Sequence, residues 1–235
     1  MALVTPETKL CDVIIDEPSV IPVINRFDIE LGVGDKTIKT ICSEKSIDLN
    51  FFLLILNAFI SESFVPEIDL KSIKAKNVIE YLRKTNNFYL QCQLPNIERH
   101  FNALIKQSDA NSNLPLLFNF FKEVRKGIEI QIENDDKWFE EIIRHEQTAT
   151  CPPKSKSAKV QQSDATEDKL NDLKNMFVIH LRGNYDRNLC HAVLHAIISL
   201  EKDIRQNDRI RNRILNPIAT ALKESATTSK LQCDN

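Results

Sequence analysis

The sequence predicts an all-α protein in which a small helical N-terminal domain precedes an antiparallel four-helix bundle. Long segments repeat apolar residues at steps of three and four, which is the period of an amphipathic helix in a bundle. Short polar segments separate them, as expected for antiparallel neighbours. The chain of 235 residues has only four glycines. This low glycine content disfavours barrels, dinucleotide-binding folds and phosphate-binding loops.

The composition also limits the partners and the location that we expect. A formal net charge of −2 provides no global attraction to nucleic acid or to acidic membranes. No apolar run reaches the roughly 18 to 20 residues of a membrane-spanning helix. The first residues lack the basic and apolar regions of a signal peptide. We therefore expect a cytoplasmic protein that binds neither nucleic acid nor membranes.

The cysteines are scattered and form no C-x-x-C motif, so we expect free thiols rather than disulfides. The six positions are Cys11, Cys42, Cys92, Cys151, Cys190 and Cys233.

Residues 1–62 are predicted to form the small helical domain. Ser19 and Asp48 are candidate N-caps of two of its helices, because their side-chain oxygens can accept from the first helical N–H groups. The apolar helix after Asp48 is expected to be buried on both sides. Gly32 and Gly34 indicate a tight turn, since glycine accepts positive φ without strain.

Residues 70–226 are predicted to form the bundle, and 227–235 a polar tail. The four helices are expected at about 76–107, with Pro95 as a candidate kink, and at about 113–146, 167–181 and 189–225. Asp164 and Glu167 resemble a capping pair for the third helix. Residues 148–162 are polar, lysine-rich and contain proline, so we expect a flexible loop there.

Each predicted bundle helix carries a stripe of residues that should face the core, and each stripe contains polar members. The stripe of the fourth helix is Val193, Ile197, Leu200, Ile204, Asn207, Arg211, Ile214 and Ile218; that of the second is Leu117, Phe121, Val124, Ile128, Gln131, Asp135, Trp138 and Ile142. The third has Ser163, Thr166, Leu170, Leu173, Phe177 and His180, and the first has Leu82, Asn86 and Tyr89, with Asn87 adjacent. Buried polar groups require partners, because an unpaired one costs about 1 to 3 kcal/mol.

The polar members of the stripes are the candidate site: Asn86 or Asn87, Gln131, Asp135, Ser163, Asn207 and Arg211. Bundles build metal sites from carboxylates and histidines on facing helices. Amides, a hydroxyl and an arginine are poor iron or zinc ligands, and Asp135 is the only carboxylate among them. We therefore interpret these positions as a hydrogen-bonded structural layer, with a surviving metal site as the alternative. No nucleophile–base signature indicates a catalytic residue.

Two other groups of residues have a functional and a structural interpretation. His191 and His195 have the spacing that can hold a metal through two imidazoles. We favour a half-exposed surface pair, because the neighbouring residues mark a different face as buried. Arg205, Arg209 and Arg213 form a basic ridge, which we expect to be a solvated, salt-bridged face rather than a phosphate-binding patch.

The chain resembles the iron–sulfur cluster repair di-iron protein family over nearly its whole length. In that family a small N-terminal helical domain precedes a hemerythrin-like bundle. The segment KLCDVIIDEPSVIPVINRFDIELGVGDKT is similar to the family's opening, where a Cys-Cys-Gly-Gly turn would place its cysteines at Gly32 and Val33 of this chain. The segment YLRKTNNFYLQCQLP resembles one that carries a liganding histidine before Leu-Pro. Here Asn86 and Asn87 occupy that region.

The later helices continue the resemblance. The family has His-x-x-x-Glu in the second helix; periodicity aligns that pair with Gln131 and Asp135, whereas counting back from Phe139 aligns it with Ile130 and Asn134. A family histidine falls near Ser163. In the fourth helix LEKDIRQNDRIRNRILNP matches His-x-x-x-Glu followed by a proline six residues beyond, with Asn207, Arg211 and Pro217 at those places.

The resemblance implies a hemerythrin-like fold in which the histidines and nearly all the carboxylates have been replaced. We expect a degenerate, metal-free member, not clearly an enzyme, that acts through protein contacts in stress response or regulation. A protein partner or a homodimer is expected, and no cofactor. The alternative is a di-iron or single-metal protein in cluster repair or in the response to oxygen or nitric oxide. A third possibility is a ligand-sensing module whose polar layer encloses a small cavity.

The structural-layer interpretation predicts that Asp135 and Arg211 form a buried ion pair in place of a metal. Removing one partner of a buried pair costs about 3 to 5 kcal/mol, because the other charge is left buried. Arg211→Ala should therefore lower the melting temperature strongly in a thermal unfolding experiment. An unchanged melting temperature would contradict the pair.

Overall fold

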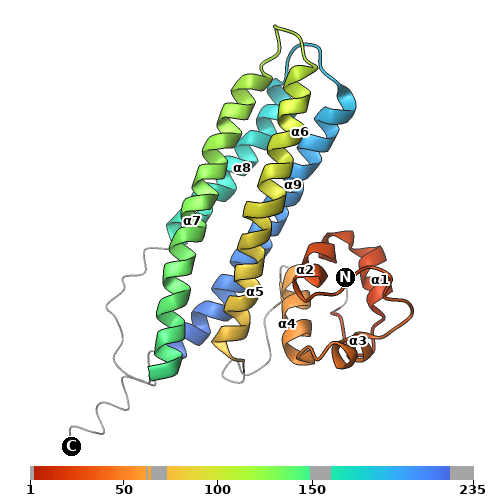
Figure 1. The fold of residues 1–235 in the computed structure, drawn as a ribbon, viewed down its shortest axis with the longest axis vertical. Coiled ribbons are helices and arrows are strands. Elements are labelled where there is room, and N and C mark those ends of the chain that lie inside the picture. Colours follow the sequence, from red (N-terminus) through yellow and green to blue (C-terminus); the bar gives the residue numbers. More distant parts are fainter. Residues whose placement is uncertain (1–2, 62, 65–72, 149–159, 223–235) are drawn as a thin grey trace, which may run out of the picture. The chain divides into compact units, whose positions relative to one another are not determined.

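A computed structural model describes residues 3–61, 63–64, 73–148 and 160–222. These residues are predominantly helical and contain no β-strand; Lys9 and Thr37 form an isolated antiparallel bridge (Figure 1). The predicted all-α class is confirmed for this part of the chain. Within the same residues, no helix is both long enough and apolar enough to cross a bilayer.

The described residues contain helices in every part of the chain. In chain order they are α1 (Leu10–Asp16), the 3-10 turn η1 (Pro18–Val20), α2 (Ile21–Arg26), α3 (Ile38–Glu44), α4 (Leu49–Ile60), α5 (Ala75–Phe88), the π-helical segment η3 (Tyr89–Gln93), α6 (Leu94–Lys106), α7 (Leu114–Thr148), α8 (Val160–His180), α9 (Arg187–Ile210) and the π-helical segment η4 (Arg211–Leu215). Residues 216–222 continue as helix.

The chain divides into two compact units. The described residues of the first unit are 3–84, 142–148 and 206–222, and those of the second are 85–141 and 160–205. The first unit therefore contains the ends of α5, α7 and α9 in addition to the predicted 1–62 domain. The boundaries 1–62 and 70–226 remain predictions.

The boundaries of the N-terminal helices are determined largely by residues that are close in the sequence. Asp48 caps α4 as predicted, with its carboxylate accepting from the Phe51 backbone N–H at 3.0 Å. The predicted Ser19 cap is wrong: Ser19 lies within η1, and its hydroxyl donates to Glu17 instead. Gly32 and Gly34 have φ of +93° and +61°, as expected for a turn that needs glycine.

Helix α4 is buried on nearly all sides, as its apolar sequence predicted. Its buried residues are Phe51, Phe52, Leu54, Ile55, Leu56, Asn57, Ala58 and Phe59. The Phe27 ring packs against three aromatic neighbours, with centroids 5.8 Å from Phe51, 4.9 Å from Phe52 and 5.5 Å from Tyr81. Aromatic pairs at such distances add to the free energy gained by burial.

Side chains from α5 and α9 complete the C-terminal ends of two N-terminal helices. The last carbonyls of a helix have no partner within it. The Lys84 ammonium donates to the Arg26 carbonyl at the end of α2 (2.9 Å), and the Gln206 amide donates to the Phe59 carbonyl near the end of α4 (2.8 Å). These bonds fix the N-terminal segment within the first unit, because an unsatisfied buried carbonyl would be costly.

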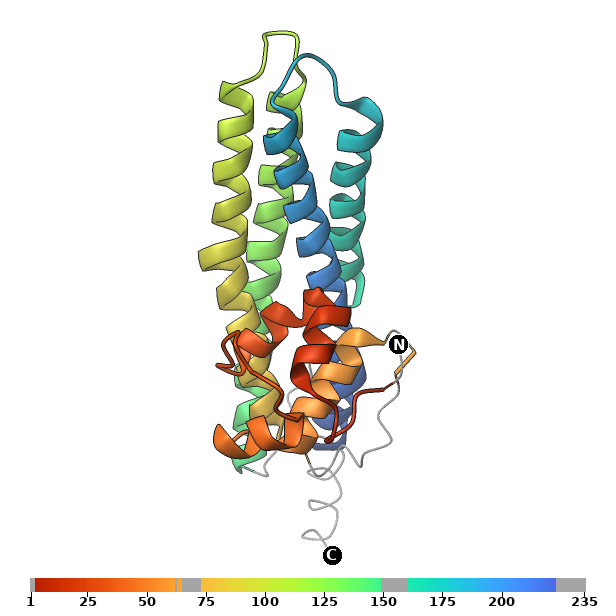
Figure 2. The same cartoon turned by 90° about the vertical axis from the view of Figure 1, so that its right-hand side faces the viewer.

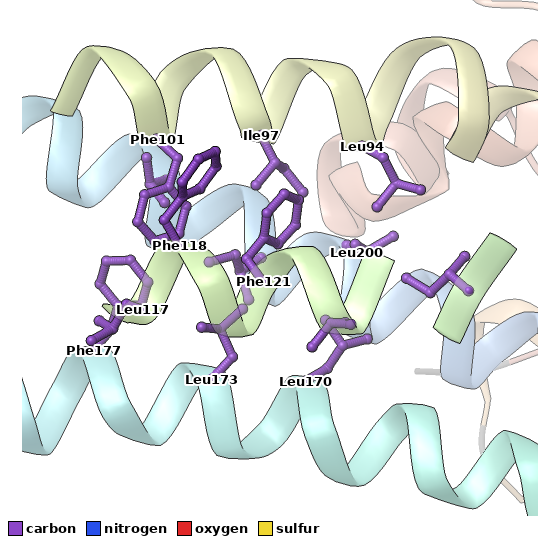
Figure 3. Packing of buried hydrophobic residues seen from close by; sticks show 14 of the residues in the cluster. Leu94, Ile97, Phe101, Leu117, Phe118, Phe121, Leu170, Leu173, Phe177 and Leu200 are labelled. Atoms are coloured by element: carbon purple, nitrogen blue, oxygen red, sulfur yellow. The ribbon is translucent and has the colours of Figure 1, made fainter. Parts of the chain in front are cut away.

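The second unit has one apolar core, to which four helical segments contribute. The buried members are Tyr89, Leu94, Ile97, Phe101 and Leu104 from η3 and α6; Leu114, Leu117, Phe118, Phe121, Val124, Ile128 and Ile132 from α7; Leu170, Leu173 and Phe177 from α8; and Cys190, Val193, Ile197, Leu200 and Ile204 from α9. These segments lie side by side in both views (Figures 1 and 2). Figure 3 shows the labelled side chains pointing toward a common interior.

Phe101 is a fully buried member of this core. Its ring centroid lies 5.1 Å from that of Phe118, 6.0 Å from Phe121 and 5.3 Å from Phe177, so one residue of α6 contacts both α7 and α8. Burying a side chain of this size stabilises the fold by about 1.5 to 3 kcal/mol.

Helix α8 begins earlier than the sequence predicted. The expected flexible loop was 148–162, yet α7 extends to Thr148 and α8 starts at Val160. The predicted capping pair is also wrong, because Asp164 and Glu167 both lie inside α8. Residues 149–159 and the predicted tail 227–235 lie outside the described residues.

Both π-helical segments lie immediately before a proline. Pro95 follows η3 by two residues, and Pro217 follows η4 by two residues. A proline ring inside a helix clashes with the carbonyl four residues earlier, which here belongs to Gln91 and Arg213, inside the π turns. The wider π turn relieves that clash. The kink expected at Pro95 remains a prediction.

Gly32 and Gly183 both have φ near +90°, so alanine substitutions at these two positions compare backbone strain alone with backbone strain plus steric overlap. A Cβ added to Gly183 would lie 2.6 Å from the Asp109 Oδ1 and 2.7 Å from the Ser112 Cα, whereas a Cβ on Gly32 would meet nothing within 4 Å. Both alanine variants should lose about 1 to 2 kcal/mol through backbone strain. Gly183→Ala should lose a further 1 to 3 kcal/mol, roughly, through overpacking. Urea unfolding of the two variants measures the difference, and equal losses would contradict the steric argument.

Candidate functional site

Of the two candidate residues on the fourth predicted helix, Asn207 is buried as expected and Arg211 is half-buried. Asn207 on α9 is 3% exposed, and the Arg211 side chain is 13% exposed. The apolar members of the same stripe are all buried, so the predicted phase of this helix is confirmed. The Arg211 guanidinium donates to the carboxylate of Asp208, one turn earlier. Asp208 was not among the partners predicted from the sequence.

On α7, in the second unit, the two predicted polar residues differ in burial. Asp135 is only 4% exposed, whereas Gln131 is half-buried. A carboxylate buried to this degree requires partners, because an isolated ionised group is strongly disfavoured in the interior. Asp135 is therefore the stronger candidate of the two.

At the end of α5 the structure shows which of the two candidate asparagines is buried. Asn86 is buried and Asn87 is exposed, so Asn86 is the residue in the stripe. The Nδ2 of Asn86 is buried and has no hydrogen-bond acceptor among the described residues. Such a group costs about 1 to 3 kcal/mol. The preceding residue, Thr85, is also buried and was missed by the periodicity argument.

On α8 the central residues of the predicted stripe are buried, as expected. Thr166 is 5% exposed, and Leu170, Leu173 and Phe177 are buried. His180 is exposed, so its assignment to the buried stripe is wrong. It occupies the last residue of α8, where its backbone carbonyl accepts from Asn113 at 2.8 Å. The side chain of Ser163 lies outside the described residues.

The candidate residues fall in both units. Asn86 and Asp135 belong to the second unit, and Asn207 and Arg211 to the first. The ion pair that the structure defines for Arg211 is with Asp208, and the pair between Asp135 and Arg211 remains a prediction.

Sequence periodicity did not predict an ion-pair network between α8 and α9 in which one carboxylate is buried. Glu201 is 5% exposed, and its carboxylate accepts from Lys174 at 2.8 and 3.1 Å. Arg205 donates to the same carboxylate at 2.9 Å and to Glu167 at 3.3 Å. Arg205 thus lies in the salt-bridged face that was predicted for the basic ridge.

Other buried polar residues of α9 were also missed: Asp203, Gln206 and Asp208. Charged residues are rarely buried unless they are paired, so a single-stripe interpretation assigns them to the surface. The available signal was the spacing of opposite charges, with Glu201 and Arg205 four residues apart and Asp208 and Arg211 three apart.

A second ion-pair group connects α6 and α7. Arg125 donates through Nε to Glu129 at 2.8 Å and through Nη1 to Glu98. The hydrogen bond to Glu129, aided by the charges of both carboxylates, raises the pKa of Arg125 above its usual value. These side chains are about one-third exposed, so the contribution to stability is modest.

No cluster of three or more histidine, cysteine, aspartate or glutamate side chains suited to a metal occurs among the described residues. His191 and His195, the alternative metal pair, are both exposed on α9. The candidate set therefore combines amides, a hydroxyl residue, one buried carboxylate and an arginine. Such donors fit hydrogen bonding better than iron or zinc coordination.

The cysteines that the structure describes, Cys11, Cys42, Cys92 and Cys190, are free thiols, as predicted; Cys151 and Cys233 lie outside the described residues. Burial, with a smaller effect of the Asp48 charge, raises the pKa of Cys42 to about 11. Burial also raises the pKa of Cys190. Neither thiol has the thiolate character of a reactive cysteine.

The sequence was compared with known proteins. No model of a protein family matches the chain, and no curated protein matches it significantly.

Thiol reactivity tests this description of the cysteines. Only about one Cys42 thiol in a thousand is ionised at pH 8, because its pKa is about 11. Iodoacetamide should therefore label the exposed Cys92 quickly in the native protein, and Cys42 and Cys190 only after unfolding in urea. Peptide mass spectrometry distinguishes the sites. Native labelling of Cys42 at the rate of Cys92 would contradict the burial.

Proposed function

We propose that this chain is a degenerate, metal-free member of the iron–sulfur cluster repair di-iron family. In this proposal a hemerythrin-like antiparallel four-helix bundle follows a small N-terminal helical domain. The protein acts through contacts with a protein partner or a second copy, in a stress-response or regulatory pathway. The all-helical chain and the shared core of α6 to α9 are compatible with this architecture.

The observation that carries the proposal is the chemistry of the buried polar positions. A di-iron bundle uses carboxylates and histidines at positions that project inward from its helices. In this chain the corresponding positions hold Asn86 and Asn207, which are buried, and Arg211, which is half-buried and whose guanidinium is paired with Asp208. A guanidinium is always protonated, so it repels a metal cation where it stands. The framework is retained while the ligand chemistry is replaced.

The alternative function, a metal-binding protein, is supported by a different observation. Asp135 on α7 and Asp203 on α9 are buried carboxylates of the second unit, each 4% exposed. Carboxylates are the ligand type that hard cations and di-iron centres use. A metal site would need both carboxylates and further donor groups, which the resemblance to the family does not identify.

Metal content separates the two functions. The protein is purified without oxygen from iron-supplemented cells, and metals are quantified by elemental analysis. We expect a well-folded protein with far less than one iron or zinc per chain, because the donors are unsuitable. Asp135→Asn and the control Asp136→Asn, at the neighbouring exposed residue, are analysed in parallel. Near-stoichiometric metal that is lost only in Asp135→Asn would overturn the proposal and favour the metal-binding alternative.

A further inference from the structure

The outer face of α8, in the second unit, carries an apolar surface near the end of the helix. Residues 176–179 have the unbroken apolar sequence MFVI, although one helix buries only one stripe of residues against a core. Within this run Phe177 is buried, whereas Val178 is 68% exposed and Ile179 is 67% exposed. Consecutive apolar residues at a helix surface are unfavourable unless the surface has a binding function.

Helix α9 extends this apolar surface. The two helices are antiparallel neighbours, and ion pairs join them at two levels. Val178 lies one turn after Lys174, and Ile198 lies nearly one turn before the Glu201 that pairs with Lys174, so the two aliphatic residues lie at a similar height. Ile198 is 39% exposed. Val178, Ile179 and Ile198 form the aliphatic patch, and a contiguous exposed group of this kind marks an interaction site.

Charges of opposite sign lie on the two sides of this patch along α8. Asp172 precedes Ile179 by seven residues, or two turns, so both lie on the outer face of the helix. Arg182 follows Ile179 by three residues, in the connection after α8. Both charged residues are exposed, and within the described part of the chain neither side chain belongs to an ion pair.

Other charges near the two ends of the patch are engaged or lie farther away. Asp109 and Asp186, near Arg182, are half-buried, and their carboxylates accept from backbone N–H groups at 3.1 and 2.8 Å. The ammonium of Lys174 is bonded to Glu201. Lys169 is exposed, but it lies almost one turn farther from the patch than Asp172 does. Along the outer face of α8 the patch is therefore acidic on one side and basic on the other.

A surface with this order of charges is complementary to a second copy of itself. A two-fold axis through the patch and perpendicular to α8 packs two α8 helices antiparallel, so that each aliphatic patch meets the other. In a two-fold interface every contact occurs twice, with the two copies exchanged. Asp172 of each copy then lies toward Arg182 of the other copy. A parallel arrangement would instead place like charges together, which disfavours it.

We propose that the aliphatic patch joins two copies of this chain, with their α8 helices antiparallel. Burial of Val178, Ile179 and Ile198 supplies most of the affinity, because exposed ion pairs contribute little. The charges of Asp172 and Arg182 select the orientation. Few side chains take part, so the interface is small and the dimer is weak and concentration-dependent.

This inference deepens the proposed function and rests on its expectation of a protein partner or a second copy. The two can fail separately. Metal content tests the degenerate, metal-free assignment, whereas the association state tests this surface. A protein that binds metal and also dimerises through α8 would overturn only the former, and a metal-free monomer would overturn only the latter.

The first test measures association of the unaltered full-length chain by sedimentation equilibrium between about 5 μM and about 1 mM. We expect a monomer–dimer equilibrium without larger species, because a two-fold contact is closed. Ile179→Lys should weaken the dimer at least about tenfold, since a charge replaces a buried aliphatic group. Ile15→Lys, at a 74% exposed residue of α1, is the control and should have no effect. A monomer at every concentration, or equal effects of the two variants, would overturn the proposal.

A charge exchange then tests the antiparallel orientation. Asp172→Arg and Arg182→Asp should each weaken the dimer several-fold at low salt, because each places like charges opposite one another. The double variant restores both ion pairs, so its dissociation constant should return to within about twofold of the original. Arg182→Asp combined with Asp16→Arg, at an exposed residue of α1, has the same net charge and should not restore association. Failure of the exchange to restore the dimer, or restoration by the control, would reject the antiparallel pairing.

Discussion

A helix that is buried on most of its circumference must find a partner for every polar group that it brings inside, and this constraint governs α9. From Leu200 to Asp208 it buries apolar and polar residues in close succession, among them Glu201, Asp203 and Asn207. Lys174 and Arg205 neutralise the Glu201 carboxylate within the second unit. In the first unit Gln206 donates to the end of α4. The polar side chains of α9 therefore bind neighbouring elements as well as fill the core, and they fix the rotation of the helix about its axis.

The sequence predicted the phase of this helix correctly, because apolar residues at steps of three and four have only one way to face a core. It did not predict which polar residues are buried beside the stripe, since burial of a charged group depends on partners that are distant in the sequence. Glu201 needs Lys174, which lies 27 positions earlier. On α5 periodicity left Asn86 and Asn87 as alternatives, and only the packing distinguishes them. Burial of the apolar stripe was predictable from the sequence, and the chemistry of the candidate site was only partly so.

Helix capping was predicted correctly where it depends only on residues that are close in the sequence. Asp48 caps α4 because its carboxylate reaches an N–H group three residues later. The same reasoning failed at Asp164, where the helix begins earlier, at Val160, and at Ser19, which lies within a 3-10 turn. Ser and Asp also form side-chain hydrogen bonds in turns and occur, though less favourably, inside helices, so tertiary context decides which of them caps. The C-terminal ends of α2 and α4 are completed by Lys84 and Gln206, and no local pattern could have identified such distant donors.

The π-helical segments change which residues of these helices share a face. Each residue of an α-helix advances the side-chain direction by about 100°, whereas a π turn inserts one extra residue per turn. The direction of the side chains after such a segment is therefore shifted relative to those before it, so that residues one position later can join the predicted stripe. Within η4 and after it two adjacent columns are buried, Ile214 with Leu215 and Ile218 with Ala219. Such a local insertion lets one helix present two differently oriented faces, one on each side of its proline.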